Sequence, residues 1–177
     1  MKKTLIAIGV LAAVAVPVTA GAKPTKTDRT NASKECRAER GMSVATREAF
    51  EARYDTFGKC VSTRSREEAR ERAVAHDNAA WQCKEERGTT DLSRQTFAER
   101  YGKNENDRNA FGKCVSEKAK AKKASMDAKD RKAIGTRKSA AKACAAERSA
   151  GSAAFRAKHG GRNAFGKCVS ATARAKS

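Results

Sequence analysis

The chain has 177 residues, of which 39 are basic and 20 acidic, and its formal net charge is +19. From Lys23 to the C-terminus only 13 residues are Leu, Ile, Val or Phe, and a single one of these is Leu. This small supply of large apolar side chains excludes one conventional hydrophobic core over such a length, because burial cannot offset the entropy of ordering the chain.

The N-terminal residues have the order of a secretory signal peptide. Two lysines precede an uncharged, mostly aliphatic run over residues 5–16, and small residues follow. This order predicts a signal peptide at residues 1–22, cleaved after Ala22 or, as the alternative, after Ala20. An uncleaved membrane anchor is disfavoured, because the run is shorter than the about 20 residues that span a bilayer. We therefore expect a secreted protein, extracellular, periplasmic or cell-wall associated, without a stable membrane anchor.

Six cysteines follow the predicted signal peptide and are expected to supply the missing stability. Export delivers them to a compartment where disulfides persist. Successive cysteines pair at separations of 24, 31 and 24 residues, and each pair lies in one copy of a sequence repeat. The repeat therefore predicts three local disulfides, each worth about 3.5 kcal/mol in the chain-entropy model. The predicted pairs are Cys36–Cys60, Cys83–Cys114 and Cys144–Cys168.

The repeat has a shared beginning and a shared end. It begins at the first cysteine with CRAERG, CKEERG or CAAERS, and it ends around the second cysteine with DTFGKCVS or NAFGKCVS. Between these motifs each copy has two rings four residues apart, which places both rings on one face of a short helix. The ring pairs are Phe50 and Tyr54, Phe97 and Tyr101, and Phe155 and His159.

The motif around the second cysteine is expected to begin a helix. Asp55, Asn109 and Asn163 each precede its phenylalanine by two residues, and Asn and Asp are favoured helix N-caps. The phenylalanine, the cysteine and the next valine share one face of that helix, so we expect all three to point inward. The intervening glycine would leave room for a close neighbour, which we expect to be the helix that carries the first cysteine.

The three copies define modules joined by charged linkers. The linkers at 63–79 and 117–140 have no proline, and Gly135 is their single glycine. Glu68 and Arg72 have the spacing of a helical ion pair. The predicted fold class is all-α, with three small disulfide-stapled helical modules joined by solvated helical linkers and little common core. The modules are expected at 32–62, 80–116 and 141–172, after a flexible N-terminal segment at 23–31 and before a tail at 173–177.

The C…F…YG…NAFGKCVS pattern resembles that of uncharacterised secreted bacterial proteins that carry repeats of this kind. The resemblance covers about half of the chain after residue 22, through the three copies. It implies a repeat architecture without an established activity.

The residue types needed for catalysis or metal binding are scarce. The two histidines are His76 in a linker and His159 at a ring position of the third copy. No spacing typical of a zinc or haem site occurs. Three regular cysteine pairs favour disulfides over a nucleophilic Cys–His pair. We therefore expect no enzymatic activity, no metal site and no cofactor.

Charged residues recur beside the cysteines. A glutamate stands three residues after each first cysteine, and a lysine directly precedes each second cysteine. If the cysteines are bonded, we expect each glutamate and lysine to pair across the bridge at the surface. A recognition role for this threefold charge is the alternative. The residues are Glu39, Glu86 and Glu147, with Lys59, Lys113 and Lys167.

Net charge gives the main indication of function. Residues 117–177 contain 17 basic and 4 acidic residues, and so carry +13 of the +17 found after residue 22. Such a field attracts polyanions in a salt-dependent manner. Because aromatic platforms for stacking on bases are missing, we do not expect specific nucleic-acid binding. The candidate polyanion-binding residues are Lys118, Lys120, Lys122, Lys123, Lys129, Arg131, Lys132, Arg137, Lys138 and Lys142.

We therefore expect a secreted, non-enzymatic repeat protein that binds anionic polymers or acidic surfaces at or outside the cell envelope. One alternative is a protein-interaction module or structural spacer whose charge only confers solubility; its partner protein is not indicated. A membrane-active cationic protein is disfavoured, because the basic linkers have few bulky apolar residues. A fragment ending at Ser116 is expected to stay folded and to lose most polyanion binding.

Overall fold

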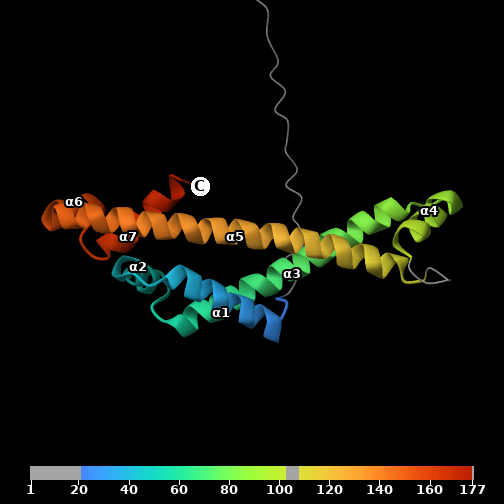
Figure 1. Ribbon diagram of the computed structural model, residues 1–177, viewed down its shortest axis with the longest axis horizontal. Helices are drawn as coiled ribbons and strands as arrows, with labels where there is room; N and C mark the ends of the chain where they lie inside the picture. The colour runs from blue at the N-terminus through green and yellow to red at the C-terminus, as the bar shows by residue number, and fades with distance from the viewer. Residues whose placement is uncertain (1–20, 103–107, 177) are drawn as a thin grey trace, which may run out of the picture.

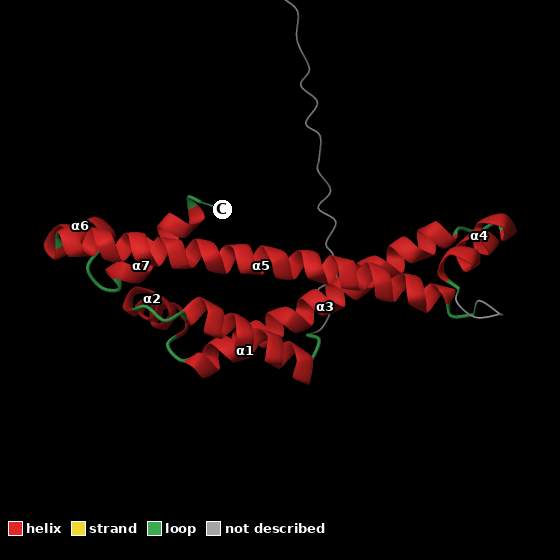
Figure 2. Cartoon of the chain, in the orientation of Figure 1, coloured by secondary structure: helices red, strands yellow, loops and turns green. Residues whose placement is uncertain are grey.

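The computed structural model describes residues 21–102 and 108–176, which contain seven helices and no strand (Figures 1 and 2). The all-α prediction is confirmed. The apolar run of the predicted signal peptide lies outside the described residues, and none of the described helices is both long and apolar enough to cross a membrane. The helices are α1 (Lys26–Arg40), α2 (Val44–Tyr54), α3 (Phe57–Arg87), α4 (Asp91–Tyr101), α5 (Ala110–Ala150), α6 (Ser152–His159) and α7 (Ala164–Arg174).

Each module consists of two helices joined by a disulfide and a short helix between them. All three predicted disulfides are present, and every cysteine is at most 1 % exposed. They join α1 to α3, α3 to α5, and α5 to α7. In each short helix the two predicted rings contact each other at a tilt of 47–50°, with centroids 4.6–5.1 Å apart. The three modules have separate apolar clusters, so the prediction of stapled modules is confirmed.

The predicted linkers are the middle parts of two long helices, α3 with 31 residues and α5 with 41. Helix α5 continues through Gly135. Figure 1 shows that α3 and α5 cross, with α1 beside the first half of α3. Their outer faces are solvated, whereas their inner faces are buried by small or charged side chains. The buried linker residues are Arg64, Ser65, Glu68, Ala69, Ala75, Ala79, Ile134 and Ala140.

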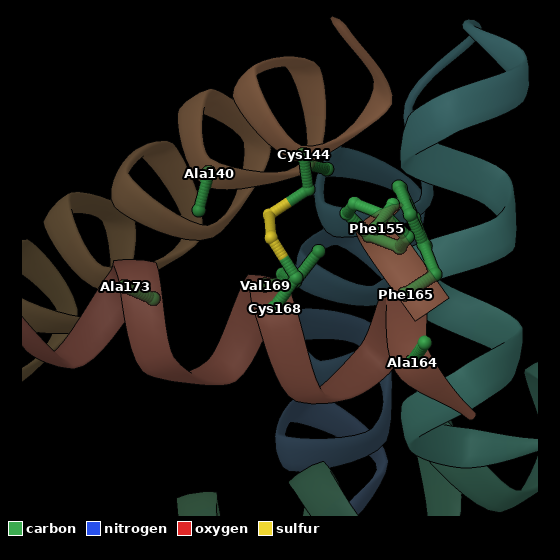
Figure 3. Packing of buried hydrophobic residues seen from close by; sticks show 9 residues of the cluster. Ala140, Cys144, Phe155, Ala164, Phe165, Cys168, Val169 and Ala173 are labelled. Carbon is green, nitrogen blue, oxygen red and sulfur yellow. A yellow bond between two sulfur atoms is a disulfide. The ribbon is translucent and has the colours of Figure 1, made fainter. Parts of the chain in front are cut away.

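Modules 1 and 3 pack against each other, whereas module 2 lies at the opposite end of α5 (Figure 1). Helix α2 of module 1 packs against α5 and α7. Its Ala45 and Ala49 lie against the core of module 3, where the Cys144–Cys168 disulfide is flanked by aromatic rings (Figure 3). An ion pair joins the same surfaces, because Arg148 of α5 donates to Glu48 of α2 (Nη2–Oε2 2.7 Å).

The predicted N-caps do not form as expected. Helix α3 begins after Thr56, whose Oγ1 accepts from the Lys59 amide at 3.2 Å, while Asp55 ends α2 with φ +65°. Asn109 and Asn163 do stand at the N-cap positions of α5 and α7, but neither side chain makes a capping hydrogen bond. The reason is their backbone: both have helical or left-handed angles, whereas a capping side chain typically needs an extended residue.

The glycines of the three motifs around the second cysteines differ in how closely other atoms approach them. A Cβ atom at Gly58 or Gly112 would meet no atom within 4 Å, so the expected close neighbour is missing there. At Gly166 a Cβ would lie 2.6 Å from Asn163 Oδ1 and 3.1 Å from the Ala52 Cβ. The close neighbour of module 3 is therefore α2 of module 1, and not the helix that carries its first cysteine.

The phenylalanines of the same motifs differ in burial. Phe165 is buried, and the Arg148 guanidinium lies over its ring at 4.6 Å. Phe111 is 36 % exposed, so the expectation that it points fully inward is wrong. Module 3 has module 1 against it, while module 2 has no such neighbour.

The predicted flexible segment at 23–31 is mostly helical. Helix α1 begins at Lys26, because Thr25 and Asp28 form a reciprocal capping box. Asp28 is buried and binds Arg72 of α3 (Nη2–Oδ2 3.1 Å). This contact also replaces the predicted pair between Arg72 and Glu68.

Candidate anion-binding site

The glutamate of each module binds the second ring of the short helix. These carboxylates therefore anchor the short helices; Glu39 is buried, whereas Glu86 and Glu147 remain partly exposed. The sequence does carry a signal for this contact: the first ring is always Phe, whereas the second ring, Tyr or His, always has a polar group that can hydrogen-bond to a carboxylate. The pairs are Tyr54 with Glu39 (Oη–Oε2 3.2 Å), Tyr101 with Glu86 (Oη–Oε1 3.0 Å) and His159 with Glu147 (Nε2–Oε1 3.2 Å).

The predicted pairing of these glutamates with the lysines before the second cysteines is wrong. Lys59 binds Asp55 one turn earlier. Lys167 Nζ donates to the Gly160 carbonyl at 3.0 Å, at the end of α6. These lysines therefore stabilise their own helix starts and loops.

In module 1 the glutamate is also the centre of a buried ion-pair network. Glu39 is 5 % exposed and accepts from Arg137 Nε at 2.6 Å, Arg137 Nη2 at 3.1 Å and Arg64 Nη2 at 3.2 Å. Burial alone would raise the pKa of Glu39. The hydrogen bonds from Arg137, with the charges of Arg137, Arg53 and Arg64, outweigh burial and hold this pKa below its ordinary value.

A second cation, Lys123 of α5, lies among three carboxylates. Its Nζ is 2.7 Å from Glu68 Oε2 and 3.0 Å from Glu71 Oε2, and it also contacts Asp127. Burial alone would lower the pKa of Lys123, but the hydrogen bonds to these three carboxylates raise it. The carboxylate oxygens lie within 4.8 Å of one another, a spacing that could suit a divalent cation. The ammonium group already occupies this position.

One other cluster brings together possible metal ligands, namely Glu147, His159 and Cys168. The Cys168 sulfur is part of a disulfide, so it is not a thiolate ligand. Neither cluster therefore offers an open metal site.

Glu35 of α1 is a largely buried acid whose ion pair with Arg64 is long. Its Oε2 has no hydrogen bond, and its distance to Arg64 Nε is 3.9 Å. Burial raises the pKa of Glu35 to about 7; the charge of Arg64 opposes this, and those of Glu68 and Asp130 add to it.

The E35Q variant tests this environment through the pH dependence of stability. The folded-state pKa of Glu35 exceeds 4.5. Its contribution to the free energy of unfolding is therefore fully present below pH 4.5 and is lost as the pH rises through about 7. The glutamine cannot ionise, so E35Q should become more stable than the wild type as pH rises, by up to about 3 kcal/mol. Urea unfolding across this range measures the difference. E67Q, which changes a half-exposed acid, is the control. Parallel stability curves for E35Q and the wild type would contradict the assignment.

Three of the ten candidate polyanion-binding residues are engaged inside the protein. Lys123 and Arg137 belong to the buried ion pairs described above. Lys118 binds Glu86 of module 2 (Nζ–Oε2 3.0 Å). We therefore leave these three out of the candidate surface.

Six others form what we call the outer basic surface. All six are exposed on α5, and none of them has an acidic partner among the described residues. They extend over residues 120–142, which corresponds to about 33 Å of helix. The outer basic surface consists of Lys120, Lys122, Lys129, Arg131, Lys132 and Lys142.

The tenth residue, Lys138, is half-buried and lines a cleft of about 560 Å³. This cleft lies between α2, α5 and α7, where modules 1 and 3 meet. We refer to it as the inter-module cleft. It was not predicted, because the contact between the two modules was not predicted.

Comparison of the chain with protein-family models, with curated proteins and with solved structures finds no match.

Proposed function

We propose that the protein is exported and binds anionic polymers at or outside the cell envelope through the outer basic surface. The observation that supports this most directly is the set of six cations that are exposed along α5 and have no acidic partner among the described residues. A polyanion lying along α5 could contact several of these side chains at once. Each contact releases counterions, so the affinity should fall steeply as the salt concentration rises.

Export is supported by two observations. The N-terminal sequence has the order of a signal peptide. The three buried disulfides are typical of proteins that fold in an oxidising compartment. A polyanion partner would then be a polymer or acidic surface of the envelope or its surroundings.

A second candidate function is that of an interaction module or spacer, and module 2 is the part that favours it. This module stands apart from the other two and exposes Trp81 and Leu92, the single Trp and the single Leu after the predicted signal peptide. Tryptophan is enriched among residues that dominate protein–protein interfaces.

The test of polymer binding needs the full chain. A fragment ending at Ser116 would remove Lys123, Asp130 and Arg137 from the buried network, so Glu68 would lose its cation and Glu39 would lose its two hydrogen bonds from Arg137. We therefore expect this fragment to be strongly destabilised instead of staying folded, because removing one partner of a buried ion pair leaves the other charge unpaired.

We therefore compare two variants with the same net charge. The outer-surface variant changes the six residues of the outer basic surface to Gln. It should bind polyphosphate at least about tenfold more weakly at low salt, with a shallower salt dependence. Fluorescence anisotropy of labelled polyphosphate measures both quantities. The control variant changes six exposed basic residues of α1 and α3 to Gln: Lys34, Arg37, Arg40, Arg66, Arg70 and Lys84.

The control variant should keep most of the affinity. Equal losses in both variants would show that only net charge matters, and would contradict a defined surface. A wild-type protein that does not bind polyphosphate at low salt would leave the interaction or spacer function as the better proposal.

A further inference from the structure

The inter-module cleft exists because the facing side chains are small. Ala49 and Ala52 of α2 and Ala141 of α5 line it, and side chains of this size do not fill the space between three helices. Counted from the first cysteine, module 2 has Thr96 and Glu99 at the positions of these two α2 alanines. Module 2 therefore lacks the alanine face of α2, whereas module 3 has Ala154 and Ala157 at the corresponding positions around its first ring.

The walls of the cleft are partly apolar. Phe50 and Val169 contribute larger apolar surface, and alanines of α2, α5 and α7 contribute the rest. The volume of about 560 Å³ falls within the range of about 300–1,000 Å³ that is typical of small-molecule sites. Such sites usually combine apolar walls with a few polar groups that fix the orientation of the ligand.

The charged groups of the cleft are almost all positive. Five basic side chains and one acidic side chain line it, leaving a net charge of +4. The acidic one is Glu39, whose carboxylate is already bound by Arg137. The four other basic residues are Arg53, Lys138, Lys167 and Arg174.

Three of these cations are available to bind an anion. Arg174 is exposed and Lys138 is half-buried, and neither has an acidic partner among the described residues. Lys167 donates one hydrogen bond to the Gly160 carbonyl, which leaves its charge unpaired. The hydroxyl groups of Thr136 and Ser170 also line the cleft. An anionic group would thus find charge and hydrogen-bond partners beside apolar walls.

We propose that the inter-module cleft binds a small amphiphilic anion, a carboxylate or phosphate head attached to an aliphatic or aromatic body. The head pairs with Lys138 and Arg174, and the body displaces water from the apolar walls. This site is separate from the outer basic surface, and its ligand differs from a polyanion because it needs an apolar body. The proposal does not depend on polymer binding.

Calorimetric titration of the full chain with dodecyl phosphate, below its micelle concentration, tests the proposal. Dodecyl phosphate should bind in a saturable manner with one site per chain. Two probes separate the contributions: inorganic phosphate lacks the body, and dodecyltrimethylammonium carries the opposite charge. Each should bind at least about tenfold more weakly. Equal binding of all three probes would overturn the proposal.

Variants locate the site. S170F and A133F fill the cleft from α7 and from α5, and each should weaken dodecyl phosphate binding at least about tenfold. A128F places the same ring on an exposed position of α5 outside the cleft, and it is the matched control. Circular dichroism confirms that each variant is folded. Unchanged affinity in both filled variants would overturn the proposal.

A charge variant distinguishes this site from the polymer surface. K138Q/R174Q should weaken dodecyl phosphate binding at least about tenfold, whereas R131Q/K142Q, with the same charge loss, should weaken it less than about threefold. The six-residue outer-surface variant should still bind dodecyl phosphate. If the outer-surface variant and K138Q/R174Q lose dodecyl phosphate binding equally, the ligand is held by general charge and the cleft is not its site.

Discussion

Removal of the Cys83–Cys114 disulfide is expected to unfold module 2 while modules 1 and 3 stay folded. Closing this loop contributes about 3.5 kcal/mol in the chain-entropy model. The cluster of module 2 comes from α3, α4 and α5 alone, with Phe97 and Tyr101 as its buried rings. In the C83A/C114A variant these few contacts no longer hold α4. Hydrogen exchange of the α4 amides and the fluorescence of Trp81, the single tryptophan, report the change.

The C144A/C168A variant is the matched comparison. Module 3 is also held by α2 of module 1 and by the Arg148–Glu48 ion pair. Its local loss of protection should therefore be smaller. Equal protection of α4 in C83A/C114A and in the wild type would show that module 2 folds without its disulfide.

Replacement of Glu39 by glutamine is expected to lower the free energy of unfolding by about 3–5 kcal/mol, the usual cost of breaking a buried ion pair. Arg64 is 6 % exposed and Arg137 is 18 % exposed, and both would lose their shared carboxylate. Urea unfolding followed by far-ultraviolet circular dichroism measures the loss. Because the folded-state pKa of Glu39 is lowered, its contribution is present above pH 4.5 and is lost as the pH falls through that lowered value.

Glu86 provides the control, because it holds the same position in module 2. Its carboxylate also binds a tyrosine and two cations, but it is 26 % exposed, so water can replace the lost contacts. E86Q should therefore cost only about 1 kcal/mol. Equal losses in E39Q and E86Q would contradict a special role for the buried network.

The module architecture could be predicted from the sequence because it depends on local repetition. Each cysteine pair lies within one copy of the repeat, and the two rings of each short helix are four residues apart. These separations are short, and the same pattern occurs three times. Disulfide pairing and the placement of both rings on one face of a short helix therefore followed from spacing alone.

The crossing of α3 and α5 could not be predicted in this way. Its contacts join residues far apart in the chain, such as Glu71 of α3 and Lys123 of α5, which are 52 residues apart. Charged residues in a helix are usually solvated, and nothing in their local pattern marks Arg64 or Glu68 as buried. Alanines that fill the interface, such as Ala69, were not counted among the large apolar residues that we expected to form cores.

The candidate site was predicted in part. Charge counting located the basic stretch of α5, and six of its ten residues form the outer basic surface. Counting could not show that Lys118, Lys123 and Arg137 are paired internally, because their partners belong to other helices. The inter-module cleft requires α2 to pack on α7, which depends on the arrangement of the whole chain.

The disulfides enclose every connection between consecutive helices. The loops that join α1 to α2 and α2 to α3 lie between Cys36 and Cys60, those around α4 lie between Cys83 and Cys114, and those around α6 lie between Cys144 and Cys168. Outside these spans, the stretches between one disulfide loop and the next are continuous helix. Proteases cut preferentially at exposed loops. A single cut in any of these connections would leave both fragments covalently joined, so the chain can be nicked once in each module without losing a fragment.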